Sequence, residues 1–234
     1  VDALPLLFAE VDLREDDDFA NWLRVGVADF DAHLAELGRL GRFIAPEDLD
    51  RPESLAPGLN FLITFDDGYV NNLRLARPLL AKHRAPALIF VSTRPMAEQT
   101  TFWSDVVVTA VQGARLRELD LGEFGFGAFA FAEGPPAGRW EDVDRLLVAL
   151  KTVGNADHPK VAAVLEHLRE RFADVLAEHL PRFRPLTADE AAELAADPWV
   201  RLGAHGHDHA ILTYLDDDAL DLNLREPRRR LEAL

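Results

Sequence analysis

Cysteine is absent from this chain of 234 residues, which excludes disulfides and thiolate metal sites. Long apolar runs are missing too: none approaches the roughly 18 residues needed to cross a bilayer, and the N-terminus lacks a basic segment followed by an apolar one. The chain starts at Val1, which is consistent with removal of a leader. We therefore expect a soluble protein without a transmembrane segment, cytoplasmic or exported, and the sequence leaves the compartment and the oligomeric state open.

Positive charge is also scarce. The chain has 25 lysines and arginines against 41 aspartates and glutamates, a net charge of −16. Nucleic-acid binding relies on clusters of Lys and Arg that displace counterions from phosphates. The only short basic run, three arginines at residues 228–230, is interpreted as the solvated face of a helix. A nucleic-acid partner is therefore not expected.

Apolar residues make up 48% of the chain, enough for one substantial core. Residues 27–41 carry apolar side chains at helical spacing. Residues 60–65 form a short apolar run, residues 72–83 again show helical spacing, and residues 87–92 form a second apolar run. Strand, helix and strand in this order predict a βαβ unit with a parallel sheet and a right-handed crossover. The predicted fold class is α/β.

The sequence changes character between Trp103 and the histidines near residue 205. Residues 122–138 are rich in Gly, Phe and Pro and are expected to be irregular or weakly β. Three helices are predicted after them, at residues 141–153, at residues 159–180, and from a Thr187–Glu190 capping box to Pro198. We interpret residues of about 104–185 as a mainly helical insertion in a single domain that spans residues 1–234.

Two apolar segments end in residues that bind metals. Residues 61–68 end in Asp66, Asp67 and Gly68, and residues 202–209 contain three histidines. Asp-Gly alone is a common turn dipeptide. Both segments are expected strands, however, and the convergence of their ends on one site explains both patterns. At a strand end, one carboxylate can bind a cation while its neighbour serves as a base.

The histidines favour a metal site. His205 and His209 are four residues apart, a spacing that fits one helical turn or a tight loop and lets both rings reach one ion. The spacing leaves open whether His207 is a functional residue or a side chain near the site, and it favours a supporting role for Asp208. One carboxylate and two histidines suit a catalytic zinc that keeps a water.

Two other metal sites share part of this pattern. Non-haem iron oxygenases use the same donor types. The run His-Gly-His-Asp-His is one residue shorter than the binuclear zinc pattern of metallo-β-lactamase-like hydrolases, and that pattern leaves Asp66 and Asp67 unexplained.

Residues 64–68, Thr-Phe-Asp-Asp-Gly, followed by His205-x-x-x-His209, resemble the NodB-homology polysaccharide deacetylases, carbohydrate esterase family four. The resemblance extends from about residue 27 to residue 234. It implies a distorted (β/α) barrel with fewer than eight regular strands, here incomplete because C-terminal barrel strands are missing. It also implies a divalent metal, Zn²⁺ first, with Asp67, His205 and His209 as ligands and Asp66 as general base.

The implied activity is metal-dependent removal of N-acetyl groups from the amino sugars of a polysaccharide or oligosaccharide. The chain departs from the family at Gly206, where Ser or Thr is common, and the family's general acid is expected beyond Leu234. These departures support an alternative: a glycan-binding or assembly protein that keeps the metal pocket and has little or no turnover.

Overall fold

The computed structural model describes residues 2–7, 10–12, 24–134 and 136–234. A parallel sheet organises the first half of the fold, with the strand order β1-β5-β6-β9 and a short β4 that also pairs with β5. These strands are β1 (Asp2–Leu7), β4 (Arg42–Phe43), β5 (Leu59–Phe65), β6 (Ala87–Val91) and β9 (Val200–Ala204). The α/β class and the predicted strands at residues 60–65 and 87–92 are confirmed.

The sheet is not closed into a barrel. Within the described part of the chain β9 pairs with β6 alone, so it forms one edge of the sheet. This agrees with the incomplete, distorted barrel predicted from the sequence. Two small sheets lie apart from the main one: β2 (Glu10–Asp12) with β3 (Arg24–Gly26), and β7 (Glu118–Asp120) with β8 (Ala128–Ala130).

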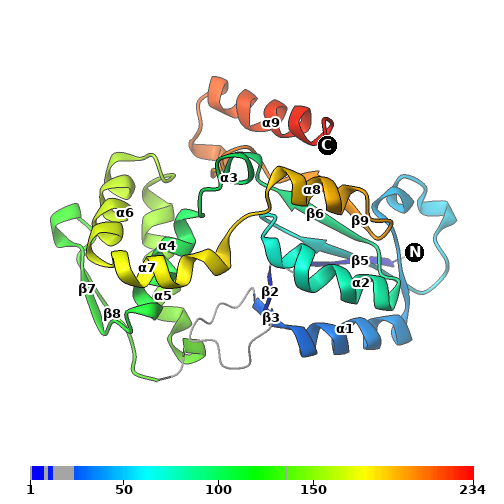
Figure 1. The fold of residues 1–234 in the computed structure, drawn as a ribbon, viewed down its shortest axis with the longest axis horizontal. Coiled ribbons are helices and arrows are strands. Elements are labelled where there is room, and N and C mark those ends of the chain that lie inside the picture. The colour runs from blue at the N-terminus through cyan, green and yellow to red at the C-terminus, as the bar shows by residue number, and fades with distance from the viewer. Residues whose placement is uncertain (1, 8–9, 13–23, 135) are drawn as a thin grey trace.

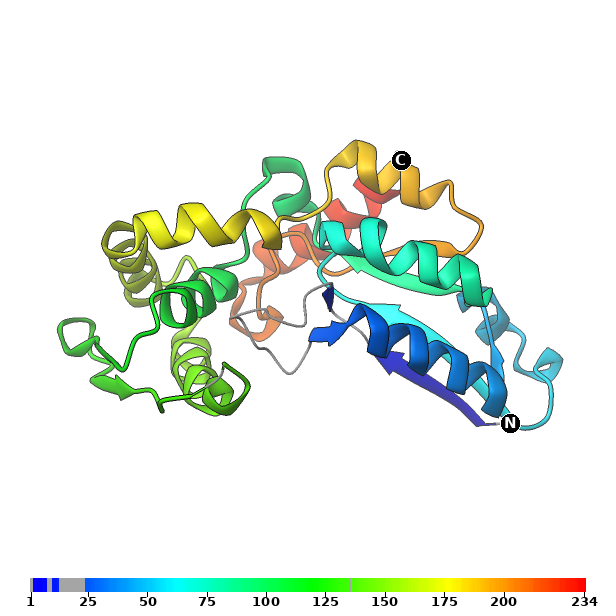
Figure 2. The ribbon, with the colours of Figure 1, turned by 60° about the horizontal axis from the view of Figure 1, so that its bottom comes forward.

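Three helices lie side by side over one face of the sheet: α1 (Val27–Leu40), α2 (Arg77–His83) and α8 (Ala188–Ala195) (Figures 1 and 2). Their apolar sides and the sheet share one core, whose fully buried members include Phe30, Leu34, Ile63, Phe65, Leu80, Ile89 and Leu194. The helix predicted at residues 27–41 is thus confirmed. The capping box is also present, because Thr187 and Glu190 cap each other's backbone at the start of α8.

The helix predicted at residues 72–83 has an irregular beginning. It starts with a π-helical turn (Asn72–Ala76) and continues as α2. Pro78 has no N–H to donate to the carbonyl four residues earlier, so a regular α-helical ladder cannot run through this point. The wider turn provides a bond from the Arg77 N–H to the Asn72 carbonyl.

A second core lies beside the sheet and is formed by Tyr69 together with residues 102–183, which we call the helical region (Figure 1). It contains α4 (Trp103–Gly113), α5 (Pro136–Val153), α6 (Pro159–Arg171) and α7 (Ala173–His179). α5 begins earlier than predicted, and the helix expected at residues 159–180 is interrupted at Phe172. α4 was not predicted as a helix: its middle residues are all buried, so its sequence lacks an amphipathic period.

The remaining elements connect these two cores. α3 (Thr93–Glu98) follows β6, and α9 (Asp217–Leu231) packs near β9 and α3. Short 3₁₀ turns are η1 (Pro46–Asp50), η2 (Pro52–Ser54), η4 (Gly122–Phe124), η5 (Leu180–Phe183) and η6 (Leu212–Tyr214). The arginines at residues 228–230 lie on α9 and pair with glutamates of the same helix, as expected for a solvated face. Among the described residues, no helix has the length and apolarity to cross a bilayer.

Glu190 supplies a pH-dependent contribution to stability. Hydrogen bonds from Arg184, outweighing partial burial, lower the pKa of Glu190 from 4.5 to about 2. Because the folded pKa lies below the unfolded one, this contribution is complete above about pH 4.5 and is lost as the pH falls through 2.

We expect Glu190→Gln to cost about 1 kcal/mol of unfolding free energy at pH 7 and progressively less at lower pH. Thermal unfolding between pH 7 and pH 3 measures the difference. Asp189→Asn removes a charge from the same turn without that ion pair and serves as the control. A cost for Glu190→Gln that stays constant with pH would contradict the assignment.

Candidate metal centre

The predicted site residues follow the ends of two parallel strands. Asp66 and Asp67 come directly after β5, and His205 comes directly after β9. β6 lies between these strands and pairs with both. The carboxyl ends of parallel strands meet at one edge of a sheet, where ligands commonly bind. Asp67 and His205, far apart in the chain, are therefore brought together across the end of β6.

Three side chains converge at this edge. The Asp67 Oδ1 atom lies 3.2 Å from His205 Nε2 and 3.0 Å from His209 Nε2. One donor atom from each residue lies within 4.8 Å of the other two. In the described part of the chain, Asp67, His205 and His209 are the only such cluster of His, Asp and Glu that could hold a metal ion.

Unusual backbone conformations make this convergence possible. Asp67 has φ of 71° and His209 has φ of 54°, both in the left-handed region. Such a conformation costs a non-glycine residue about 1–3 kcal/mol and persists only where the surroundings enforce it. Gly68 also has positive φ, 82°, and a Cβ at this residue would lie 2.9 Å from a methyl group of Val91. The turn after β5 is therefore pressed against the end of β6.

The electrostatics of the three residues are coupled. Burial alone would raise the pKa of Asp67, but the hydrogen bonds from His205 and His209 outweigh it and hold that pKa well below its usual range. Burial alone would lower the pKa of His205, yet the Asp67 carboxylate raises it above its ordinary value. The triad thus combines a firmly ionised carboxylate with His205, an imidazole whose raised pKa favours a proton that cation binding would displace.

Asp66 has a different environment. Burial, followed by the charge of Asp67, raises the pKa of Asp66, although the nearby imidazoles partly oppose the shift. Its carboxylate has no hydrogen-bond partner among the residues that the structure describes. The two adjacent carboxylates are therefore distinct: Asp67 is engaged by both imidazoles, and Asp66 is available to accept a proton.

His207 lies apart from the triad. It is buried, and its Nδ1 lies 2.9 Å from Thr93 Oγ1. Burial lowers the pKa of His207, which keeps the ring neutral. Its neighbour Asp208 lies near Arg94 at 3.4 Å and Asn223 at 3.3 Å. The question that the sequence left open is thus answered for His207: its ring supports the loop and does not join the donor cluster.

Aromatic rings connect the triad to the helical region. The Phe102 ring meets the His209 ring edge to face at 4.8 Å, and Tyr69 meets Phe102 in the same way at 5.1 Å. The Tyr69 hydroxyl donates to the buried Asp105 carboxylate at 3.0 Å. The Nδ1 atom of His209 has no hydrogen-bond partner among the described residues, so its ring is held by the contact of Nε2 with Asp67 and by the Phe102 ring.

A cavity of about 460 Å³ opens beside the triad. Its lining combines His205 and His209 with Trp103 and Lys151 of the helical region. A second cavity of about 350 Å³ is also lined by Trp103 and His209. Trp103 and His209 are therefore shared by the two cavities.

The comparison with protein families agrees with the motifs. A family model described as polysaccharide deacetylase matches residues 57–234. The chain belongs to the polysaccharide deacetylase family. No curated protein matches the chain at a significant level.

Solved deacetylases share the fold. Streptococcus pyogenes deacetylase PplD, in complex with acetate, matches with a TM-score of 0.55 and 15% identity over 98% of this chain and 67% of its own. The polysaccharide deacetylase BC0361 from Bacillus cereus matches with a TM-score of 0.51 and 14% identity over 99% of this chain and 46% of its own. The chain thus spans between about half and two thirds of the length of these two proteins.

The donor chemistry of the triad fits a divalent cation. One carboxylate oxygen and two imidazole nitrogens are donors that Zn²⁺ accepts, and a catalytic zinc site uses three protein donors and leaves a position open. Asp67, His205 and His209 would hold the ion. Their positions at one open sheet edge leave space on the side of the two cavities.

Several residues that shape the centre were missed by sequence reasoning. Asn155 exchanges two hydrogen bonds with the backbone of Ile211, at 2.7 and 3.3 Å, and Asn223 binds the backbone of His207 and Asp208. Single asparagines far from the motifs carry no local signal. The contact of Phe102 with His209 could not be read from the sequence either, because it depends on the tertiary fold.

We expect the protein to bind one Zn²⁺ per chain and His209→Ala to weaken binding by at least about 10-fold, since one of three donors is lost. Competition with a chromophoric chelator measures the affinity. His33→Ala, an exposed histidine on α1, is the matched control and should leave affinity unchanged. If His207→Ala abolished binding while His209→Ala did not, the donor set would be wrong.

Proposed function

We propose that this deacetylase is a metal-dependent hydrolase that removes N-acetyl groups from the amino sugars of a glycan, with Zn²⁺ as the metal. The observation that carries the proposal is the meeting of Asp67, His205 and His209 beside a separate carboxylate, Asp66, at one sheet edge. Membership of the polysaccharide deacetylase family supports the reaction type.

The two aspartates take different roles in this proposal. A divalent cation bound to the triad would polarise the acetyl carbonyl and make a bound water more acidic. Asp66 accepts a proton from the attacking water as the general base. Its raised pKa suits that role because a base works best when its pKa approaches the working pH. Asp67 cannot replace it, since both imidazoles already engage its carboxylate.

The helical region supports recognition of the sugar in this proposal. We interpret residues of about 104–185 as an insertion that flanks the site and selects the glycan. Trp103 and Lys151 line the same cavity as His205 and His209. An aromatic face beside a polar group can pack against a pyranose ring and bind its hydroxyls. Loops at the carboxyl ends of α/β strands are where specificity is usually built.

We expect Asp66→Asn to reduce acetate release from N-acetylglucosamine oligomers by about 10²–10⁴-fold, because the general base is lost. Zn²⁺ affinity should stay near that of the original protein, because Asp66 is not a ligand. Acetate is measured enzymatically with saturating Zn²⁺ and, as a control, with chelator. A variant that loses the metal but regains activity when Zn²⁺ is resupplied would show that the two aspartates have been assigned in the wrong order.

The same assay separates the alternative function. If the Zn²⁺-loaded protein binds the oligomers but releases no acetate, the glycan-binding or assembly role is correct and the hydrolase proposal is wrong. Gly206, at a position where the family commonly has Ser or Thr, is the residue that most favours this alternative.

A further inference from the structure

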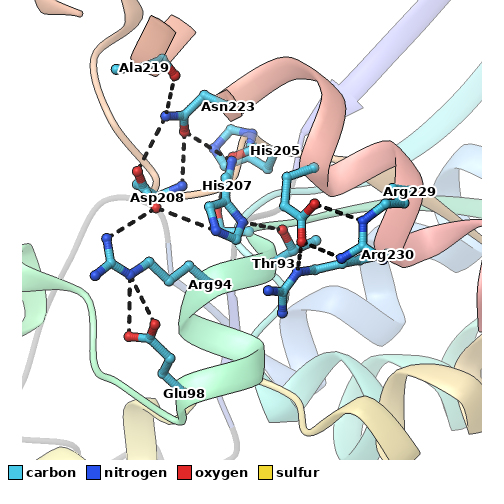
Figure 3. A network of polar contacts seen from close by, with 12 residues as sticks. Thr93, Arg94, Glu98, His205, His207, Asp208, Ala219, Asn223, Arg229 and Arg230 are labelled. Carbon is cyan, nitrogen blue, oxygen red and sulfur yellow. Dashed lines mark hydrogen bonds and ion pairs between the residues drawn. The ribbon is translucent and has the colours of Figure 1, made fainter. Parts of the chain in front are cut away.

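Asn223 of α9 lies beneath the segment that carries the two candidate histidine ligands. We call this segment, residues 205–209, the histidine loop. Asn223 is only 1% exposed, and its side chain points from α9 toward the loop (Figure 3). Its amide oxygen accepts the backbone N–H groups of His207 at 3.0 Å and Asp208 at 2.9 Å. Its amide nitrogen donates to Asp208 Oδ2 at 3.3 Å and to the Ala219 carbonyl at 3.0 Å.

These four bonds use the full capacity of the asparagine amide, which has two acceptor sites and two donors. The side chain is therefore matched to this place in both polarity and direction. Without the amide oxygen, the His207 and Asp208 N–H groups would lose their partner in a buried position. Leaving a buried donor unsatisfied is costly.

The opposite side of the histidine loop is held by the junction of β6 and α3. The Ser92 hydroxyl donates to the His205 carbonyl at 3.0 Å. The Thr93 and Arg94 N–H groups donate to the Gly206 and His207 carbonyls at 3.3 and 2.8 Å. The carbonyls of the loop are thus bound on the α3 side, and two of its N–H groups are bound by Asn223 alone.

The loop needs such support because it is short and its backbone conformation is unusual. Gly206 has φ of 75° and His209 has φ of 54°. Gly206 also has no side chain with which to brace the loop. Only three residues separate His205 from His209, so the backbone between them sets the spacing of the two imidazoles. A small change at His207 or Asp208 moves one ring relative to the other.

We propose that Asn223 is a positioning residue for the metal centre: its amide oxygen fixes the His207 and Asp208 N–H groups so that His205 and His209 keep the spacing that one cation requires. The inference rests on the metal centre of the proposed function. Asn223 itself does not contact the triad, and its role is exerted through the loop backbone.

The chain offers a control for general loosening of α9. Asp216 caps the N-terminus of this helix by accepting the Ala219 N–H at 2.9 Å, and among the described residues it forms no hydrogen bond or ion pair with the histidine loop. Asp216→Ala should lower the thermal stability of the protein, because the cap of α9 is lost, without removing a bond to the loop. Asn223→Ala removes the bonds to the loop directly.

The experiment compares Zn²⁺ affinity, the visible spectrum of the Co²⁺-substituted protein and the thermal stability of the metal-free protein. We expect Asn223→Ala to weaken Zn²⁺ binding by about 10–100-fold and to change the Co²⁺ spectrum, because the ligand geometry is disturbed. Asp216→Ala should lower thermal stability while affinity and spectrum stay as in the original protein.

A rescue variant tests the hydrogen bonds themselves. Asn223→Asp keeps an oxygen that can accept the His207 and Asp208 N–H groups, but its negative charge repels the Asp208 carboxylate. Combining it with Asp208→Asn restores complementary polarity, so the double variant should bind Zn²⁺ more tightly than Asn223→Ala does. If Asn223→Ala does not fold, the single variant Asn223→Asp takes its place, and the double variant should bind Zn²⁺ more tightly than Asn223→Asp does.

The possible results are distinguishable. If the original protein binds no Zn²⁺, the metal centre and this inference both fail. If it binds Zn²⁺ but Asn223→Ala changes neither affinity nor spectrum, the inference alone fails. Equal losses of affinity in Asn223→Ala and Asp216→Ala, or a double variant no better than Asn223→Ala, would also overturn it.

Discussion

The buried Asp67 carboxylate, held between two imidazoles, is the interaction on which the rest of the centre depends. Burial opposes its charge, and the hydrogen bonds from His205 and His209 overcome that cost. A buried charge without such partners would be strongly destabilising. The contact with the Asp67 carboxylate also raises the pKa of His205. In the metal-free protein, the negative charge of Asp67 is therefore compensated within the site. A bound cation would take over this compensation.

This dependence explains why the centre lies across three parallel strands. β6 separates β5 from β9, and its end is where the two ligand-bearing turns meet. The Ser92 N–H, just beyond β6, donates to the Asp67 carbonyl at 3.2 Å, and the His205 N–H donates to the Val91 carbonyl at 3.0 Å. Both motifs are therefore tied to one strand that carries no metal ligand. The left-handed conformations of Asp67 and His209 are sustained by these neighbours.

The sequence could indicate the candidate ligands because each motif is local. Asp66 and Asp67 follow an apolar run, and His205 and His209 follow another, so both patterns appear in short windows. The capping box at Thr187 was predictable for the same reason. β1 was not expected: it lies before the first recognisable helix, and it contains Pro5, which a strand tolerates at a sheet edge.

Other elements could not be predicted from the sequence because they depend on burial in the tertiary fold. The middle of α4 reads Val-Val-Val-Thr-Ala-Val, a run of mostly β-branched residues whose local preference favours a strand. It is helical because it is enclosed by the helical region, where an apolar residue is accommodated on every side. Asn223 was hidden for a different reason. Its partners are 15 and 16 residues earlier in the chain, and no period relates them.

Two asparagines hold the histidine loop and the segment just after it, and the choice of a neutral amide is informative. Asn223 binds the loop at His207 and Asp208, and Asn155 binds the segment just after it at Ile211, from the helical region. A carboxylate at either place could accept the same N–H groups, but it would add a negative charge near the imidazoles and raise their pKa. An amide accepts and donates hydrogen bonds without titrating. The backbone of the loop is thus fixed from both cores by groups that leave the charge balance of Asp67, His205 and His209 to the triad itself.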